Sequence, residues 1–132
     1  MSTQKQKMLA GEHYIADDPE LARDVLTAWE ATSAFNRLGP ADGERAREIL
    51  EALFEHFGED AQIRAPLYVD YGRYISFGRG SFANFGLVAL DVAPITIGCD
   101  VQIGPNIQLL TPTHPIAPEL RRQKFEAGAH YH

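Results

Sequence analysis

The chain has 132 residues, 45% of them hydrophobic, and a formal net charge of −6 at pH 7. This length suits one domain, or one domain with a small appendage. The acidic balance, without a run of Lys and Arg, excludes the basic face that a nucleic-acid partner requires. The single Cys99 excludes an intramolecular disulfide. No signal peptide or apolar run of membrane length is present, so we expect a cytoplasmic protein that does not enter a membrane.

The N-terminal region predicts helices. Residues 1–10 favour a short helix that ends near Gly11. Asp17-Asp18-Pro19 places an acidic N-cap before a proline at the first helical position, which indicates a second helix that Gly39-Pro40 stops. Its residues at helical spacing are Leu21, Val25, Ala28, Thr32 and Phe35, with Trp29 beside them.

A third helix is predicted after Asp42, which can serve as its N-cap, and Gly58 would close it. Its apolar stripe comprises Ala46, Ile49, Leu50, Leu53 and Phe57. Two helices with one apolar face each need a surface to cover. We therefore expect residues 1–60 to form a helical cap on whatever residues 61–132 build.

The segment from Ala65 to His114 divides into eight six-residue words, with Ile95-Thr96 outside the frame. The first position is always apolar: Ala65, Tyr71, Phe77, Ala83, Ala89, Ile97, Ile103 and Leu109. The fifth is small or aliphatic: Val69, Ile75, Ser81, Leu87, Ala93, Val101, Ile107 and Thr113. Glycine occupies the second position of four words, which we interpret as supplying positive φ at a corner.

A period of six indicates a solenoid of very short strands, with three words to a coil and somewhat under three coils in all. The alternative is an ordinary all-β domain with short strands and glycine-rich turns. Such a domain would have to keep the register at two fixed positions by chance. We therefore predict an α+β protein, a β-solenoid over residues 61–132 capped by residues 1–60, whose first coil the helices cover.

His114 lies where the words give way to a loop that contains Pro115, Pro118 and the charged residues 119–124. A neutral imidazole can accept a proton at physiological pH, so His114 is a candidate general base for an alcohol or an amine. The alternative, a histidine that only anchors the loop, is equally compatible with the spacing. With His130 and His132 it also resembles a zinc pattern, but no carboxylate or thiol has the required spacing, so no metal is predicted.

Other polar candidates lie within the words. Asn84 occupies the second position, where an asparagine either turns a corner at positive φ or offers its amide to a ligand. Asp91 and Asp70 are expected to face outward, where a carboxylate is either simply solvated or binds substrate. Asp17 and Asp18 suit helix capping better than ligand binding.

Several segments carry a resemblance to a known family, namely Lys7-Met-Leu-Ala-Gly-Glu-His-Tyr14, Asp70-Tyr-Gly72, Phe82-Ala-Asn-Phe85, Ile95-Thr-Ile-Gly98 and Thr113-His-Pro-Ile116. Together they resemble the hexapeptide-repeat sugar O-acetyltransferases, the maltose and galactoside acetyltransferase family. The resemblance covers essentially the whole chain. It implies a left-handed parallel β-helix behind a small helical domain, assembled as a homotrimer with active sites between neighbouring subunits.

The same resemblance implies an activity. The residue matching His114 is the general base that takes the proton from an acceptor hydroxyl as it attacks the thioester of acetyl-CoA, the co-substrate. The residues matching Asp70, Asn84 and Asp91 line the sugar pocket. An acidic residue of the N-terminal domain approaches them, a role open to Asp17 or Asp18.

The resemblance also implies further coils beyond this loop, which build most of the CoA groove. We therefore expect an acceptor-side half-site in a chain truncated at its C-terminus. A non-catalytic β-helix whose last coil recruits another chain is the alternative function. A trimeric zinc hydro-lyase of the same β-helix class is a third, and it predicts bound metal.

Overall fold

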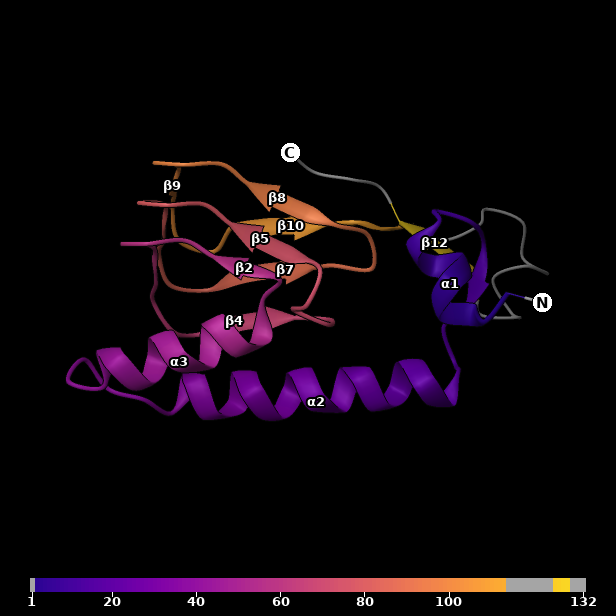
Figure 1. Ribbon diagram of the computed structural model, residues 1–132, viewed down its shortest axis with the longest axis horizontal. Coiled ribbons are helices and arrows are strands. Elements are labelled where there is room, and N and C mark those ends of the chain that lie inside the picture. Colours follow the sequence, from indigo (N-terminus) through magenta and orange to yellow (C-terminus); the bar gives the residue numbers. More distant parts are fainter. Residues whose placement is uncertain (1, 114–124, 129–132) are drawn as a thin grey trace.

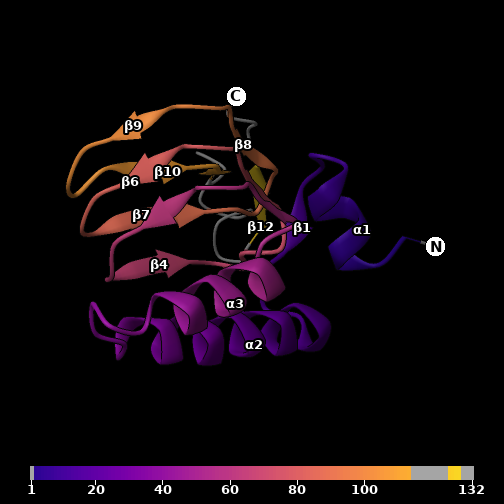
Figure 2. The ribbon, with the colours of Figure 1, turned by 60° about the vertical axis from the view of Figure 1, so that its left-hand side comes forward.

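The computed structural model describes residues 2–113 and 125–128. Its helices are α1 (Gln4–Leu9), α2 (Pro19–Asn36) and α3 (Gly43–Leu53). Figures 1 and 2 show α2 and α3 side by side beneath a stack of short strands, while α1 lies at one edge of that stack. Helices α2 and α3 thus cover the first coil.

The strands of the solenoid, β2 to β10, form three parallel sheets that the chain visits in turn. The first comprises β2 (His56–Phe57), β5 (Ile75–Phe77) and β8 (Ile95–Ile97); the second comprises β3 (Gln62–Ile63), β6 (Phe82–Ala83) and β9 (Gln102–Ile103); the third comprises β4 (Leu67–Val69), β7 (Leu87–Leu90) and β10 (Gln108–Leu110). In these three sheets each strand pairs with its counterparts in the neighbouring coils. This is a three-sided parallel solenoid, and ordinary hairpins do not account for it.

The coil is longer than the predicted three words. Leu67 pairs with Leu87 and Ile75 with Ile95, so each partner lies 20 residues further along the chain. The two residues set aside as Ile95-Thr96 are therefore not a single insertion, because the same extension occurs between β4 and β5. Consequently the first two predicted words, which begin at Ala65 and Tyr71, are out of register.

Among the second-position glycines, Gly72 has the predicted positive φ, but the glycines of the later words do not. Gly78 and Gly98 do not have positive φ; left-handed backbone occurs instead at the fourth position, at Asp60, Gly80 and Asp100 in successive coils. A Cβ atom on Gly78 would collide with the backbone of Gly98. Glycine is required there because two coils approach closely, not because a corner turns.

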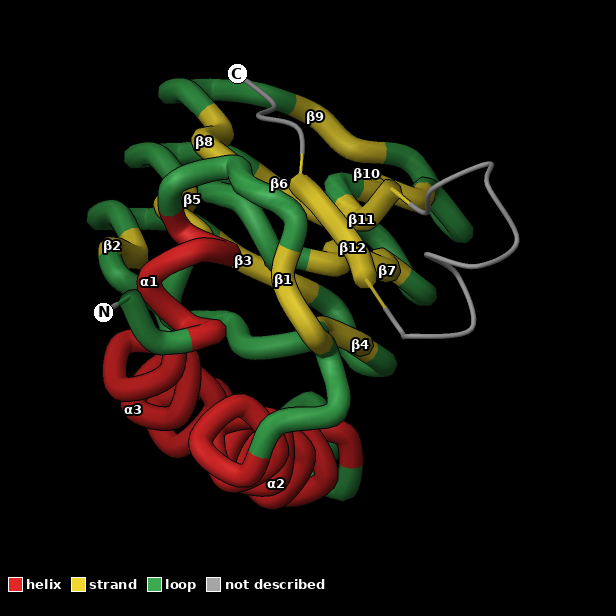
Figure 3. Tube along the Cα trace, turned by 90° about the vertical axis from the view of Figure 1, so that its right-hand side faces the viewer, coloured by secondary structure: helices red, strands yellow, loops and turns green. Residues whose placement is uncertain are grey.

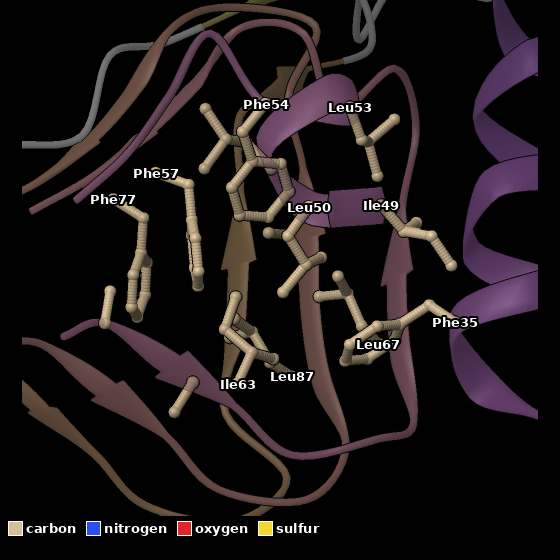
Figure 4. Packing of buried hydrophobic residues seen from close by; sticks show 14 of the residues in the cluster. Phe35, Ile49, Leu50, Leu53, Phe54, Phe57, Ile63, Leu67, Phe77 and Leu87 are labelled. Carbon is tan, nitrogen blue, oxygen red and sulfur yellow. The ribbon is translucent and has the colours of Figure 1, made fainter. Parts of the chain in front are cut away.

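The core is continuous from the cap into the first coils. Figure 4 shows Leu50 of α3 pointing toward Ile63 and Leu87, with Phe35 of α2 beside Leu67. Phe57 stacks on Phe77 of the next coil, with ring centroids 5.7 Å apart. Apolar faces that neither helix could bury alone are thus covered by the open end of the solenoid.

The third helix is shorter than predicted. It ends at Leu53, and Phe54 adopts an extended conformation as its C-cap. Phe57 therefore belongs to β2, where it pairs with Phe77, and not to the helical stripe. The reason is tertiary, since backbone pairing with β5 outweighs helical spacing. The first coil accordingly begins at His56, inside the segment predicted as cap.

Two further expectations for α2 can be compared with the structure. Asp18 is its N-cap and Pro19 its first residue, as predicted. Val25, assigned to the apolar stripe, is 39% exposed, and Trp29 is 65% exposed.

Of the helices within the described residues, none has both the length and the apolar composition needed to cross a bilayer.

Candidate functional site

The polar candidates gather where the third sheet ends. Asp70 follows β4 and Asp91 follows β7, so both lie at the long corner that gives each coil its extra residues. Tyr71, Asp91 and Thr111 occupy the same position in three successive coils, as the pairing of Val69 with Ala89 and of Leu90 with Leu110 shows. All three are buried.

Asp91 does not face outward, so that expectation is wrong. Its side chain is 0% exposed. Its Oδ1 accepts hydrogen bonds from the backbone N–H groups of Tyr71 and Gly72, at 2.9 and 3.0 Å, and its Oδ2 accepts one from Tyr74 at 3.1 Å. The carboxylate is occupied by the corner of the preceding coil and offers no surface to a sugar.

The burial of Asp91 also changes its acidity. Removal from water raises the pKa of this carboxyl from 3.8 to about 6, although the three backbone N–H groups act in the opposite direction. Burial raises the pKa of Tyr74 too, and its hydroxyl has no hydrogen-bond partner among the described residues. The corner is therefore a low-dielectric environment in which the Asp91 carboxylate binds backbone N–H groups.

A small antiparallel sheet covers this corner. β1 (Tyr14–Ile15) pairs with β12 (Phe125–Gly128), which also pairs with β11 (Pro112–Thr113). In Figure 3, which views the molecule from this side, the three strands lie across the front of the coils. Asp17 follows β1 closely, and His114 directly follows β11. Two strand spacings separate β1 from β11, about 10 Å.

His114 itself lies outside the described residues, as do His130, His132 and the charged residues 119–124. The structure does place Thr113, the residue that precedes His114 at the end of β11. Thr113 pairs with Ala127 beside the corner that carries Asp70 and Asp91. Within residues 2–113 and 125–128, no three His, Cys, Asp or Glu side chains are grouped as metal ligands.

Asn84 lies at the opposite end of the same sheet. It precedes β7, whereas Asp91 follows it, so a strand separates the two, on the order of 20 Å. Asn84 is not among the residues with positive φ, and its Oδ1 accepts the N–H of Phe85 at 2.8 Å. It therefore does not turn a corner in the left-handed region. Within one chain, it does not meet Asp70.

The two acidic residues before α2 have different roles. Oδ2 of Asp18 accepts the N–H groups of Glu20 and Leu21, at 3.0 and 3.3 Å, as an N-cap does. Asp17 is exposed at the same turn. Of the pair, Asp18 is therefore the residue that caps the helix.

Two residues of this corner were missed at the level of sequence. Thr111 Oγ1 donates to the carbonyl of Leu90 at 2.7 Å and accepts the N–H of Ala93 at 3.0 Å. Tyr71 packs with Met8, Tyr14, Leu21 and Val92 in a second apolar cluster. The sequence did contain a signal for them, because the spacing from Tyr71 to Asp91 and from Asp91 to Thr111 equals the coil length of 20 residues. A frame of six residues does not align all three.

A separate cavity of about 910 Å³ lies between α3 and the first coil. Its lining includes Arg47 and Arg64 but none of the predicted site residues. Arg47 donates to the carbonyl of Gly58 at 2.7 Å, and the Arg64 guanidinium lies 5.1 Å from the ring centroid of Phe85. Both guanidinium groups already contact other groups of the protein. We therefore interpret the cavity as the junction between the helical cap and the solenoid.

Comparison with known proteins agrees with this architecture. Residues 7–58 match the family model described as the maltose acetyltransferase hexapeptide capping motif. Nodulation protein L of Rhizobium meliloti (strain 1021) is 41% identical over 126 residues, which is 96% of this chain and 69% of that protein.

Two solved structures are also similar. The maltose O-acetyltransferase from Clostridium difficile 630 superposes with a TM-score of 0.95 at 35% identity, over 98% of this chain and 69% of the other. A hexapeptide-repeat acetyltransferase of Vibrio cholerae O1 biovar eltor, in complex with acetyl coenzyme A, gives 0.85 at 29% identity, over 98% and 69%.

The chain therefore belongs to the hexapeptide-repeat acetyltransferases that carry the maltose acetyltransferase capping motif, a family of acyltransferases. It spans about two thirds of the length of the relatives that it matches.

Proposed function

We propose that this chain forms the acceptor side of an acetyl-CoA-dependent O-acetyltransferase that acts on a sugar hydroxyl. Membership of the family supports acetyl transfer, and one similar structure contains acetyl coenzyme A. The sugar acceptor rests on the likeness to a maltose O-acetyltransferase. Since the chain spans only part of its relatives, the activity of a complete protein is part of the proposal.

In the proposed reaction, His114 takes the proton from the acceptor hydroxyl while its oxygen attacks the thioester carbonyl. The C–O bond forms, the C–S bond breaks, and CoA leaves as the thiol after it receives the proton. No acyl-enzyme is formed. Asp70 and Asp17 are proposed to hold the hydroxyls of the sugar, a task for which carboxylates suit.

One observation carries this proposal. The β1–β12–β11 sheet brings the turn containing Asp17 and the departure point of His114 to the corner that carries Asp70. Segments distant in the sequence thus converge on one edge. A general base needs an acceptor held within hydrogen-bond reach, and convergence of this kind supports such a site.

The position of Asn84 supports a site shared between subunits. Since Asn84 and Asp70 lie at opposite ends of one sheet, a small acceptor does not span them within one chain. We propose a homotrimer of left-handed solenoids in which Asn84 of one subunit lines the pocket that Asp17, Asp70 and His114 form on the next. In a closed ring of this kind, each site receives residues from two copies.

The experiment measures release of the CoA thiol with a chromogenic thiol reagent, in the presence of acetyl-CoA and maltose or glucose. His114→Ala is expected to abolish acceptor-dependent release, a loss of about 10²-fold or more for a general base. His56→Ala is the matched control, because His56 is an exposed histidine of the first coil that is not among the proposed site residues. Retention of the wild-type rate by His114→Ala would refute the general-base role.

A further inference from the structure

The corner after β7 is the point at which three parts of the proposed site are joined. Toward the preceding coil, Asp91 holds the N–H groups of Tyr71, Gly72 and Tyr74. Those residues directly follow Asp70 in the chain. The position of the Asp70 backbone therefore depends on a carboxylate that lies one coil away.

Toward the following coil, the same corner is tied to Thr111. Its hydroxyl bridges the carbonyl of Leu90 and the N–H of Ala93, which flank Asp91 in the sequence. Thr111 directly precedes β11, and His114 follows that strand. Any displacement of the corner is thus transmitted toward the segment from which His114 departs.

Toward the cap, the corner packs against the small sheet. A Cβ atom on Gly128 of β12 would lie 2.8 Å from that of Ala93, so β12 rests directly on the corner. Val92 packs with Tyr71 and with Tyr14 of β1. Asp17 follows β1, and its turn is therefore placed by the same contacts.

We propose that Asp91 is a positioning residue for the acceptor site: it does not touch substrate but fixes the corner that sets Asp70, Asp17 and His114 relative to one another. This inference rests on the proposed function and replaces the substrate-binding role predicted for Asp91. A carboxylate suits the task, since it offers acceptor lone pairs on both oxygens and carries no donor.

The chemistry of an amide at this position predicts a specific defect. In Asp91→Asn, one oxygen can still accept the N–H groups of Tyr71 and Gly72. The NH₂ group then faces the N–H of Tyr74, and two donors cannot pair. The variant keeps the size of the side chain but loses the hydrogen bond from the N–H of Tyr74.

The test compares Asp91→Asn with Ser81→Ala in the full chain. Ser81 is also 0% exposed and also bridges two coils, since its Oγ donates to the carbonyl of Gly98 at 2.5 Å and accepts the N–H of Val101 at 2.9 Å. It lies at another corner, away from the proposed site. The control therefore reproduces the loss of a buried link between coils without disturbing the positioning contact.

For Asp91→Asn we expect the KM for the acceptor to rise by about tenfold and kcat to fall, with the KM for acetyl-CoA unchanged. For Ser81→Ala both KM values are expected to stay within about twofold. Equal changes in the two variants, or a change confined to acetyl-CoA, would overturn the positioning role.

A second measurement separates this inference from the proposed function. Amide hydrogen exchange at Tyr71, Gly72 and Tyr74 is expected to accelerate by about tenfold or more in Asp91→Asn and not in Ser81→Ala. If the wild type transfers no acetyl group, the proposed function fails, and exchange alone decides whether Asp91 fixes the corner. Unchanged exchange in Asp91→Asn would overturn the inference whatever the activity.

Discussion

Asp91 shows how its position in the fold changes the chemistry of a single residue. In the sequence it is one acidic residue among 18 Asp and Glu. In the fold it is excluded from water, and its pKa rises to about 6 because burial disfavours the charged form more than three N–H groups favour it. A carboxyl group that is solvated in the unfolded chain thus titrates in a different range once the protein folds.

This pKa predicts a pH-dependent stability. Since the folded-state pKa is raised above the unfolded value of 3.8, the contribution of Asp91 to the free energy of unfolding is present below about pH 4 and lost as the pH rises through about 6. The full change is roughly 3 kcal/mol. Urea unfolding should be measured for the wild type and for Asp91→Asn between pH 3.5 and 7.5. The difference between their free energies of unfolding, wild type minus variant, should fall by an amount of that order.

Asp100→Asn serves as the comparison, because Asp100 is an exposed carboxylate on the next coil. If the difference in the free energy of unfolding between the wild type and Asp91→Asn does not change with pH, this would contradict the burial of the carboxyl.

Two glycines at equivalent positions allow a second residue-scale test. A Cβ on Gly78 would meet the backbone of Gly98 and Cys99, whereas one on Gly104 would meet nothing within 4 Å. Neither glycine has positive φ. Gly78→Ala should therefore lower the free energy of unfolding by about 1–3 kcal/mol through overpacking. Gly104→Ala should change it by less than about 0.5 kcal/mol. Similar effects of the two changes in thermal unfolding would refute the close approach of the coils.

At the scale of elements, the start of α2 separates stabilisation from function. Asp18 caps the helix, so Asp18→Ala should cost about 1 kcal/mol of stability. Asp17→Ala should raise the KM for the acceptor, because Asp17 lies on the turn that approaches the proposed site. Chemical denaturation and the thiol assay on both variants check this. The assignment would be reversed if Asp18→Ala, and not Asp17→Ala, changed the KM.

The end of α3 shows why local pattern did not decide this element. Ala46, Ile49, Leu50, Leu53 and Phe57 form one continuous helical stripe, and all but Ala46 are buried as expected. Yet Phe57 is buried from a strand, stacked on Phe77. An inward-facing residue satisfies both patterns, so hydrophobic spacing alone cannot tell where a helix becomes a strand.

At the scale of the whole molecule, a site shared between subunits predicts complementation. Asn84→Ala and His114→Ala should each be inactive alone. When the two are unfolded and refolded together in equal amounts, about one quarter of the sites in a trimer combine an intact Asn84 with an intact His114. Partial recovery of activity near that fraction is expected in the thiol assay.

Each variant refolded by itself provides the control and should remain inactive. Absence of recovery, in a mixture that light scattering shows to be trimeric, would place Asn84 and His114 in the same subunit or remove one of them from the site.

The sequence by itself determined that the chain winds as a solenoid under a helical cap. Apolar first positions such as Phe77 and Ala83 and the cap signal Asp18-Pro19 are local patterns that report which side chains face inward and where a helix begins. The family resemblance also predicts a role for Asp70 and His114 in the reaction, which stays a prediction.

Tertiary structure decided the coil length of 20 residues, the burial of Asp91 and the separation of Asn84 from Asp70. These properties depend on which residue of one coil lies beside which residue of the next. A period of six specifies that alignment only if no coil is lengthened. Here the corner after the third strand is extended, and this shifts Tyr71 from its predicted position and stacks it with Asp91 and Thr111 in the buried corner.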